Sequence, residues 1–171
     1  MVLAIVLAWS NFLFGADFAS AQTIFEVPPT DISLHNPSST EGQRNRTTLS
    51  VFVPADAGAS LKALVLTQLV NIDDWDWGQS EPVVYKGRYS VRGRGVKGLA
   101  TKEFLEDDLS LVITLSPPIK PGERVNIVMK GYNPAANIYQ WTSQLVPDGP
   151  DPVVYMGKSL RLNIYEYDPF N

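Results

Sequence analysis

The chain has no cysteine and a single histidine, His35, among its 171 residues. Without cysteine it can form no disulfide, no thiolate metal site and no thiol nucleophile. A catalytic triad of serine, histidine and aspartate would have to include His35, which stands before Asn36-Pro37 in a segment rich in turn-forming residues. Because a catalytic base must be held rigidly, this is a poor position for one. We therefore expect no enzymatic activity.

The chain also lacks an excess of positive charge, since its formal net charge is −4 at neutral pH. A negatively charged protein gives no electrostatic reason to expect nucleic acid as a partner. Basic residues do cluster once, in the segment KGRYSVRGRGVK from Lys86 to Lys97. We interpret this segment as a solvated, flexible loop or a frayed edge strand. The alternative is contact with an anionic partner or a membrane surface.

No apolar run is long enough to span a bilayer, which takes about 20 residues. The run from Val2 to Trp9, extended at Phe12 to Phe14, is interrupted by polar residues and followed by small ones at Ala19-Ser20-Ala21. This pattern is typical of a secretory signal peptide, although no lysine or arginine precedes the apolar run. We expect residues 1–21 to be a signal peptide and the protein to be exported. A retained N-terminal helix is the alternative.

What the chain does contain is a strand pattern, most clearly between Leu109 and Tyr132. Two segments there, Leu109 to Ser116 and Arg124 to Lys130, alternate with a period of two, which gives each a buried face and a solvated face. Between them Pro121-Gly122 favours a type II turn with a positive φ at the glycine. We therefore predict a β-hairpin, whose first arm ends near Ser116 because two prolines follow and offer no N–H for pairing.

Other segments with strand character are separated by turn-forming residues at intervals of about ten residues. Leu61 to Val70 fits a helix or a strand by periodicity, and we favour a strand because it is short and contains β-branched residues. We expect residues 22–46 to be an extended lead-in with one brief strand at Asp31 to His35, and residues 47–168 to form a single domain. The predicted fold class is all-β, an antiparallel immunoglobulin-like β-sandwich with long loops. The remaining strand candidates are Thr47 to Val53, Leu99 to Leu105, Ile138 to Leu145 and two short strands around Gly157 within Val153 to Tyr165.

One long loop, Asn71 to Gly78, carries candidate binding residues of two kinds. Its acidic residues Asp73, Asp74 and Asp76, together with Asn71, could ligate Ca²⁺ through oxygen atoms. Their spacing differs from that of an EF-hand, because Trp75 stands where the third oxygen ligand would fall and no glutamate closes the loop. A solvated loop without a metal is therefore the simpler interpretation.

The same loop contains Trp75 and Trp77, which share a face if the segment is extended because one residue separates them. As an exposed pair they could form a platform for a sugar ring or a partner protein. Packing in the core or at its rim is the favoured alternative, because large aromatic side chains usually bury their area internally. The direction in which these rings point therefore separates the two hypotheses.

The C-terminal half of the chain resembles a known family, and the resemblance covers most of residues 47–165. Together with VPADAG (Val53 to Gly58), a series of blocks in the C-terminal half is similar to the cyanobacterial exported domain of unknown function 2808. The resemblance implies a cyanobacterial protein exported to the periplasm, cell envelope or thylakoid lumen, and it brings no activity and no functional residue. It is loosest across Asp73 to Lys97. The blocks in the C-terminal half are PPIKPGERVNIVMKGYNP (Pro117 to Pro134), IYQW (Ile138 to Trp141), Pro147, Gly149, Tyr155, Gly157 and RLNIY (Arg161 to Tyr165).

These observations favour an exported, non-catalytic β-sandwich protein without a cofactor. We expect it to bind an envelope or membrane-associated protein or glycan, and no nucleic acid, through its loops or an exposed edge strand. The alternative is a carbohydrate- or metal-binding accessory module that uses the loop from Asn71 to Gly78. The candidate binding residues are Trp75, Trp77, Asp73, Asp74 and Asp76.

Overall fold

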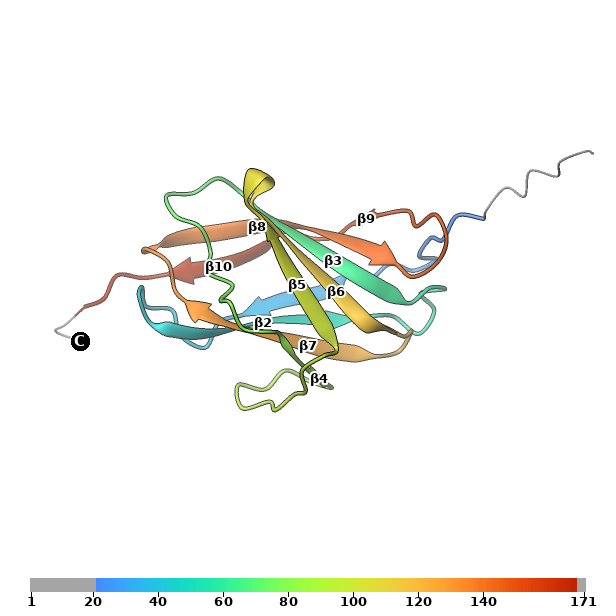
Figure 1. Cartoon of the computed structure of the whole chain (residues 1–171), viewed down its shortest axis with the longest axis horizontal. Helices are drawn as coiled ribbons and strands as arrows, with labels where there is room; N and C mark the ends of the chain where they lie inside the picture. The colour runs from blue at the N-terminus through green and yellow to red at the C-terminus, as the bar shows by residue number, and fades with distance from the viewer. Residues whose placement is uncertain (1–20, 169–171) are drawn as a thin grey trace, which may run out of the picture.

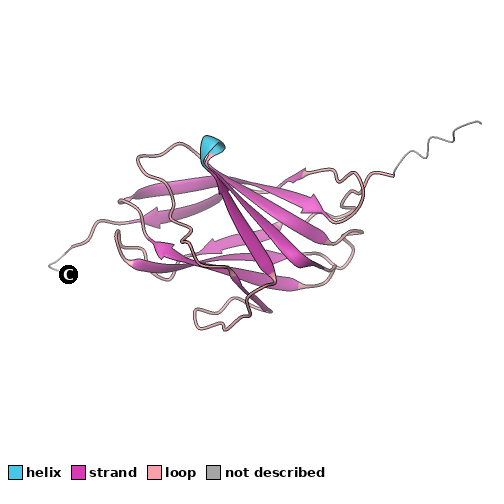
Figure 2. Ribbon diagram, in the orientation of Figure 1, coloured by secondary structure: helices cyan, strands magenta, loops and turns pink. Residues whose placement is uncertain are grey.

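A computed structural model describes residues 21–168 of the chain. In this part of the chain, two antiparallel sheets pack face to face, and one turn of 3-10 helix, Glu106–Asp108, is the only helical segment (Figures 1 and 2). The strands are β1 (Asp31–His35), β2 (Arg44–Phe52), β3 (Leu61–Gln68), β4 (Val83–Lys86), β5 (Ala100–Leu105), β6 (Ser110–Ile119), β7 (Arg124–Tyr132), β8 (Asn137–Pro147), β9 (Tyr155–Met156) and β10 (Leu160–Ile164).

One layer is a four-stranded sheet in the order β1-β2-β7-β4. Its central strands β2 and β7 pair over their whole length, from Arg44 opposite Tyr132 to Phe52 opposite Arg124. The brief strand expected at Asp31 to His35 is β1, which pairs with β2 along one edge. Residues 22–46, expected as an extended lead-in, thus supply an edge strand and the first residues of a central one.

The other layer is a six-stranded sheet in the order β10-β8-β3-β6-β5, with β9 also paired to β8. β3 lies between β6 and β8, which confirms that Leu61–Gln68 is a strand and not a helix. The strands expected near Leu99 and Ile138 are β5 and β8, and the two short strands around Gly157 are β9 and β10.

The predicted hairpin between Leu109 and Tyr132 is wrong in its pairing. Both strands form, and the turn is as expected, because Gly122 has a φ of +82° and the Glu123 N–H donates to the Lys120 carbonyl over 3.1 Å. However, β6 pairs with β3 and β5, whereas β7 pairs with β2 and β4. The turn therefore carries the chain from one sheet to the other. The alternating pattern indicates only that one face of each strand is buried. That face is buried equally well when the two strands lie in opposite sheets as when they pair with each other.

The prolines after Ser116 interrupt the strand ladder without ending the strand. β6 extends to Ile119, but its register against β3 shifts, since Ala63 faces Thr114 while Leu61 faces Ile119. The intervening residues, which include both prolines, bulge out of the ladder because proline has no N–H to donate.

The core fills the space between the two sheets with the inward-facing residues of each strand. Complete burial of one such aliphatic side chain contributes about 1.5–3 kcal/mol relative to leaving it exposed. Beside this aliphatic core lies an aromatic cluster that combines two residues of β8 with two residues of a loop. The fully buried aliphatic residues include Leu49, Val51, Leu64, Leu66, Leu111, Ile113 and Ile127, and the aromatic ones are Trp75, Trp77, Tyr139 and Trp141.

The fold class is therefore the predicted one, an all-β antiparallel sandwich of immunoglobulin-like type. The predicted signal peptide, residues 1–21, lies outside the described residues apart from Ala21. Between residues 21 and 168 there is no helix with the length and apolar character needed to cross a bilayer.

Candidate binding surface

The loop of residues 71–78, which we call the aromatic loop, turns its tryptophans into the core. Only 2% of Trp75 and 5% of Trp77 is exposed. The Trp75 ring lies edge-on to Tyr139 and Trp141 of β8, at centroid distances of 5.4 and 5.3 Å, and Trp77 lies 5.7 Å from Trp141. Neither tryptophan offers a face to a ligand, so the exposed platform considered from the sequence does not form. The rings pack in the core, as the alternative interpretation expected.

Polar contacts hold the aromatic loop in this inward position. The side-chain amide of Gln68 accepts a hydrogen bond from the Trp75 N–H and donates one to the Asp73 carbonyl, each over 2.9 Å. The indole N–H of Trp75 donates to the Thr47 hydroxyl on the inner face of β2 over 3.2 Å. A buried donor left unpaired costs free energy, so these contacts favour one position of the ring.

Two of the three acidic residues of the aromatic loop, Asp73 and Asp76, accept backbone hydrogen bonds through their carboxylates, whereas Asp74 is exposed. Asp76 accepts from the N–H groups of Gly78 and Tyr132 over 2.7 and 2.9 Å, and Asp73 accepts from those of Asp74 and Ala135 over 2.9 and 3.2 Å. The carboxylates thus tie the loop to the end of β7 and to the turn that follows. Within residues 21–168, no group of three or more His, Cys, Asp or Glu residues is arranged to hold a metal ion.

Two glycines let the aromatic loop approach β7 closely. A Cβ atom on Gly131 would lie 2.1 Å from the Asp76 carbonyl oxygen, and one on Gly78 would lie 1.7 Å from the Lys130 carbonyl oxygen. Gly78 also has a φ of +67°, which favours glycine. From the other sheet, the ammonium group of Lys102 donates to the carbonyls of Trp77 and Gly78, and burial lowers the pKa of this lysine. The aromatic loop is therefore a fixed part of the sandwich.

A second long connection, residues 87–95, folds back over the outer face of the four-stranded sheet, and we call it the flap. In Figure 1 it is the yellow-green loop beside β4, on the side of this sheet that faces away from the other layer. It leaves the edge strand β4 and reaches the opposite edge, where the ring of Tyr89 stacks on His35 of β1. The centroids are 3.7 Å apart and the planes differ by 9°. The flap therefore crosses the width of the sheet.

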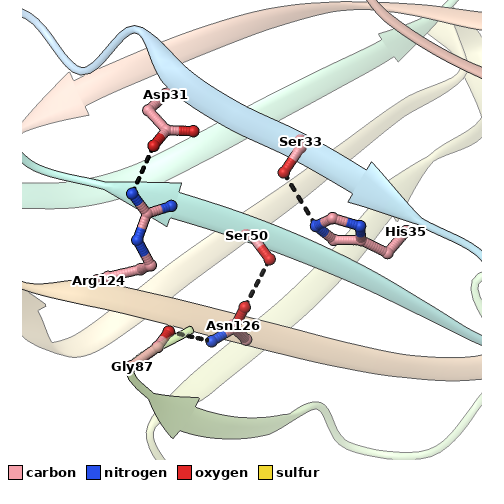
Figure 3. Close-up of polar contacts among 7 residues, drawn as sticks. All are labelled: Asp31, Ser33, His35, Ser50, Gly87, Arg124 and Asn126. Carbon is pink, nitrogen blue, oxygen red and sulfur yellow. Dashed lines mark hydrogen bonds and ion pairs between the residues drawn. The ribbon is translucent and has the colours of Figure 1, made fainter. Parts of the chain in front are cut away.

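Side chains from the two central strands hold the flap on the sheet. The guanidinium of Arg46 in β2 donates to the carbonyls of Val91 and Gly93 over 2.6 and 2.8 Å. The amide of Asn126 in β7 donates to the Gly87 carbonyl over 2.8 Å and accepts from the Ser50 hydroxyl over 2.5 Å (Figure 3). Asn126 and Ser50 are buried although they lie on the outer face. The sequence-based expectation of a flexible loop or frayed edge strand missed this cover.

His35 is held more firmly than its place before Asn36-Pro37 suggested, although the strand that contains it was expected. It belongs to β1, where Nε2 lies 3.0 Å from the Ser33 hydroxyl oxygen, and Figure 3 shows the two side chains on one face of the strand. Burial lowers the pKa of His35 below its ordinary value of 6.5, so the neutral imidazole is favoured. Its position results from strand pairing and from the Tyr89 ring, neither of which a local sequence pattern reveals.

The flap and its flanks present cations to solvent. Arg88, Arg92, Arg94 and Lys97 are exposed, and residues 21–168 supply no hydrogen bond or ion pair to their side chains. Lys86, at the end of β4, is different because it pairs with Glu123 over 2.5 Å. This surface is therefore positive on a chain whose net charge is negative.

Beside the flap, where β2 begins and β7 ends, lies a groove of about 710 Å³. Its lining includes Arg44, Arg46, Lys130, Tyr132, Gln79 and Val91. Asp76 also lines it, with both carboxylate oxygens engaged by backbone N–H groups as described above. The groove thus joins the flap, the outer face of the sheet and the last residues of the aromatic loop.

The model of a family described as "Protein of unknown function (DUF2808)" matches residues 22–164. The chain belongs to this family. The DUF2808 match extends over β1, the aromatic loop and the flap, and so includes the stretch where the sequence resemblance is loosest. No curated protein matches the chain.

Solved structures similar to this DUF2808 chain are distant in sequence. An uncharacterized protein from Nocardia farcinica with an immunoglobulin-like fold has a TM-score of 0.47 at 15% identity, covering 78% of this chain and 96% of that one. The bacterial hydrophobin BslA has a TM-score of 0.49 at 12% identity, covering 83% of this chain and 99% of that one. The collagen-binding domain of a Staphylococcus aureus adhesin has a TM-score of 0.41 at 12% identity, covering 78% of this chain and 96% of that one. These likenesses concern the fold alone.

Sequence reasoning missed Arg46, Lys130 and Tyr132 as members of one surface. Lys130 is visible in the sequence as a residue of the solvated face of its strand. What was missing is the pairing of β2 with β7, which places Arg46 opposite Lys130 and Arg44 opposite Tyr132. Residues that pair across an antiparallel ladder share a face, so the register alone brings them together.

Proposed function

We propose that this DUF2808 protein is exported and binds, without catalysis, an anionic component of the cell envelope through its flap and the sheet face below. The observation that carries the proposal is a set of cations on the flap, Arg88, Arg92 and Arg94, and on its flank, Lys97. Their side chains form no hydrogen bond or ion pair within the described residues. Clustered cations of this kind raise the local concentration of anionic partners and strengthen their binding at low ionic strength.

Two features support binding without catalysis. Ser33 and His35 lie within hydrogen-bond distance, but the imidazole is covered by Tyr89, and no carboxylate among residues 21–168 bonds to its other ring nitrogen. A serine nucleophile needs an accessible base that a third group orients. In the aromatic loop, the other candidate site, both tryptophans pack in the core, and the carboxylates of Asp73 and Asp76 accept backbone hydrogen bonds.

Export is supported by the sequence pattern of residues 1–21. The measurement is N-terminal sequencing of material recovered outside the cytoplasm of the native organism. We expect the mature chain to begin at Gln22. An intact Met1 on such material would contradict cleavage.

Binding is tested by co-sedimentation with isolated envelope material at increasing salt concentration. The flap variant is Arg88→Ser/Arg92→Ser/Arg94→Ser, and the matched control, with the same loss of charge elsewhere, is Lys120→Ser/Lys158→Ser/Arg161→Ser. An exposed ion pair contributes roughly 0.2–1 kcal/mol, and the flap variant loses three cations. We therefore expect the flap variant to bind about tenfold more weakly and the control to bind as the wild type does. Equal binding by all three proteins, or equal losses in both variants, would contradict the proposal.

A further inference from the structure

The groove beside the flap has walls of different chemistry. One side is the outer face of the sheet, with Arg44 and Arg46 from β2 opposite Tyr132 and Lys130 from β7. The flap contributes Val91, and the chain contributes Gln79 directly after the aromatic loop. Because Arg46 and Asp76 anchor the flap and the aromatic loop, respectively, the walls are held in place before any ligand binds.

The charges in the groove favour an anion. Arg44 and Lys130 are exposed, and neither forms a hydrogen bond or ion pair with another residue of the described chain. The Nε of Arg46 is buried there without an acceptor among residues 21–168. Asp76 is the one acid of the lining, and both of its oxygens are already hydrogen-bonded. A carboxylate in the groove would therefore meet Arg44 and Lys130, which form no ion pair within the described residues.

The uncharged residues of the lining favour a sugar ring. Half of Tyr132 is exposed, at 51%, and the Arg44 guanidinium lies 5.9 Å from the centroid of its ring. An aromatic ring beside polar donors suits an amphipathic ligand, because the apolar face of a pyranose can pack on the ring while its hydroxyl groups bond to neighbouring polar groups. Gln79 is exposed at the rim and can both donate and accept such bonds.

The shape of the groove favours an extended, acidic oligosaccharide over a membrane surface or a small anion. A bilayer surface is flat and cannot enter a recessed groove, whereas an extended oligosaccharide can. A single phosphate ion is small against about 710 Å³, a volume in the range of roughly 300–1,000 Å³ typical of sites for larger ligands.

We infer that the groove binds an acidic polysaccharide, with a uronate carboxylate between Arg44 and Lys130 and a pyranose ring against Tyr132. This inference rests on the proposed function, since it names the chemical class of the anionic envelope component. Arg92 follows Val91 of the groove lining, so a chain that continues beyond the groove on this side would meet this flap cation.

The test is titration of the full mature chain with tetragalacturonate, followed by calorimetry and by NMR of backbone amides. Maltotetraose, inorganic phosphate and phosphatidylglycerol vesicles are the comparison ligands. The groove variants are Arg44→Gln/Lys130→Gln and Tyr132→Leu, all at exposed positions, and Arg46 is retained so that the flap stays closed. The charge control is Lys120→Gln/Arg161→Gln.

We expect saturable binding of tetragalacturonate with shifts at residues 44–46 and 130–132, and weak or no binding of maltotetraose. The double groove variant should bind at least tenfold more weakly, Tyr132→Leu about fivefold, and the control within twofold of the wild type. The inference is overturned if tetragalacturonate does not saturate, if the double variant binds as the wild type does, or if phosphate or vesicles bind as well at the same residues.

The outcome also separates this inference from the proposed function. Flap-dependent co-sedimentation with envelope material together with no binding of tetragalacturonate would overturn the ligand class and leave the proposed function standing. Groove-dependent binding of tetragalacturonate together with flap-independent co-sedimentation would instead contradict the proposed function.

Discussion

The aromatic loop and the flap are both attached to β2 and β7, but on opposite faces of the same sheet. Two consecutive residues of β2 make the difference, because Thr47 accepts a hydrogen bond from Trp75 on the inner face and Arg46 holds the flap on the outer face. The aromatic loop is thereby part of the core, and the flap is a cover whose cations remain in solvent. The tryptophans of the aromatic loop thus contribute to the core although they lie in a loop.

The largest expected effect comes from truncating the aromatic loop. Trp75→Ala should lower the free energy of unfolding by about 3–5 kcal/mol, because it leaves a cavity among Tyr139, Trp141 and Trp77. Tyr89→Ala in the flap is the comparison, and it should cost less than about 1 kcal/mol because the flap is peripheral. Chemical denaturation monitored by circular dichroism measures both. Similar losses in the two variants would mean that the loops do not differ as described.

A smaller effect is expected where the aromatic loop touches β7. Gly131→Ala would place a Cβ atom 2.1 Å from the Asp76 carbonyl oxygen, so the loop must move away. Such overpacking costs about 1–3 kcal/mol. Gly42→Ala is a poor control, because the φ of Gly42 is +68°. The control is Ala57→Gly, which changes a buried small residue without adding an atom. Thermal unfolding that leaves Gly131→Ala at the wild-type midpoint would contradict the close approach.

Release of the flap should leave the core almost intact. Arg46→Met removes the two bonds to Val91 and Gly93, so we expect trypsin to cleave at Arg92 and Arg94 at least tenfold faster. The free energy of unfolding should change by less than about 1 kcal/mol. Arg161→Met is the control for loss of an exposed arginine. Unchanged cleavage in Arg46→Met would show that Arg46 does not hold the flap.

The smallest expected effect is a dependence of flap closure on pH. Burial under Tyr89 lowers the pKa of His35, and in the open state this pKa returns toward 6.5. The closed state is therefore favoured above about pH 6.5, and this preference weakens as the pH falls toward the lower pKa of the closed state. Charged and titratable groups near this contact include Tyr85, which raises the pKa of Tyr89, and Arg46, which lowers it.

Tryptic cleavage cannot follow this change cleanly because trypsin depends on pH, so the measurement is NMR of the Tyr89 ring between pH 7.5 and 5. We expect its resonances to move toward those of an unstacked tyrosine in the wild type. In His35→Phe, which retains a ring but cannot titrate, they should stay constant. Equal shifts in both proteins would exclude His35 as the cause.

The strands of this fold were largely predictable, because alternation with a period of two marks a buried face wherever the segment pairs. That pattern identified β3 and β8 as strands but could not identify their partners. It therefore predicted a hairpin of β6 and β7, which lie in different sheets. The surroundings of the candidate binding residues depend on such distant contacts as well. The surface formed by Arg46 and Lys130 depends on the β2–β7 register, and the burial of Trp75 depends on contacts with Thr47 and Gln68, all distant in the sequence.

Amide hydrogen–deuterium exchange of the full mature chain, with and without envelope polysaccharide, tests most directly whether the flap and not the aromatic loop is the recognition surface. In the free protein we expect amides of the aromatic loop to exchange only on global unfolding and those of the flap to exchange by local opening. On addition of polysaccharide, exchange should slow in residues 87–95 and 130–132 and stay unchanged in residues 71–75. Slower exchange in residues 71–75, with the flap unchanged, would contradict the account.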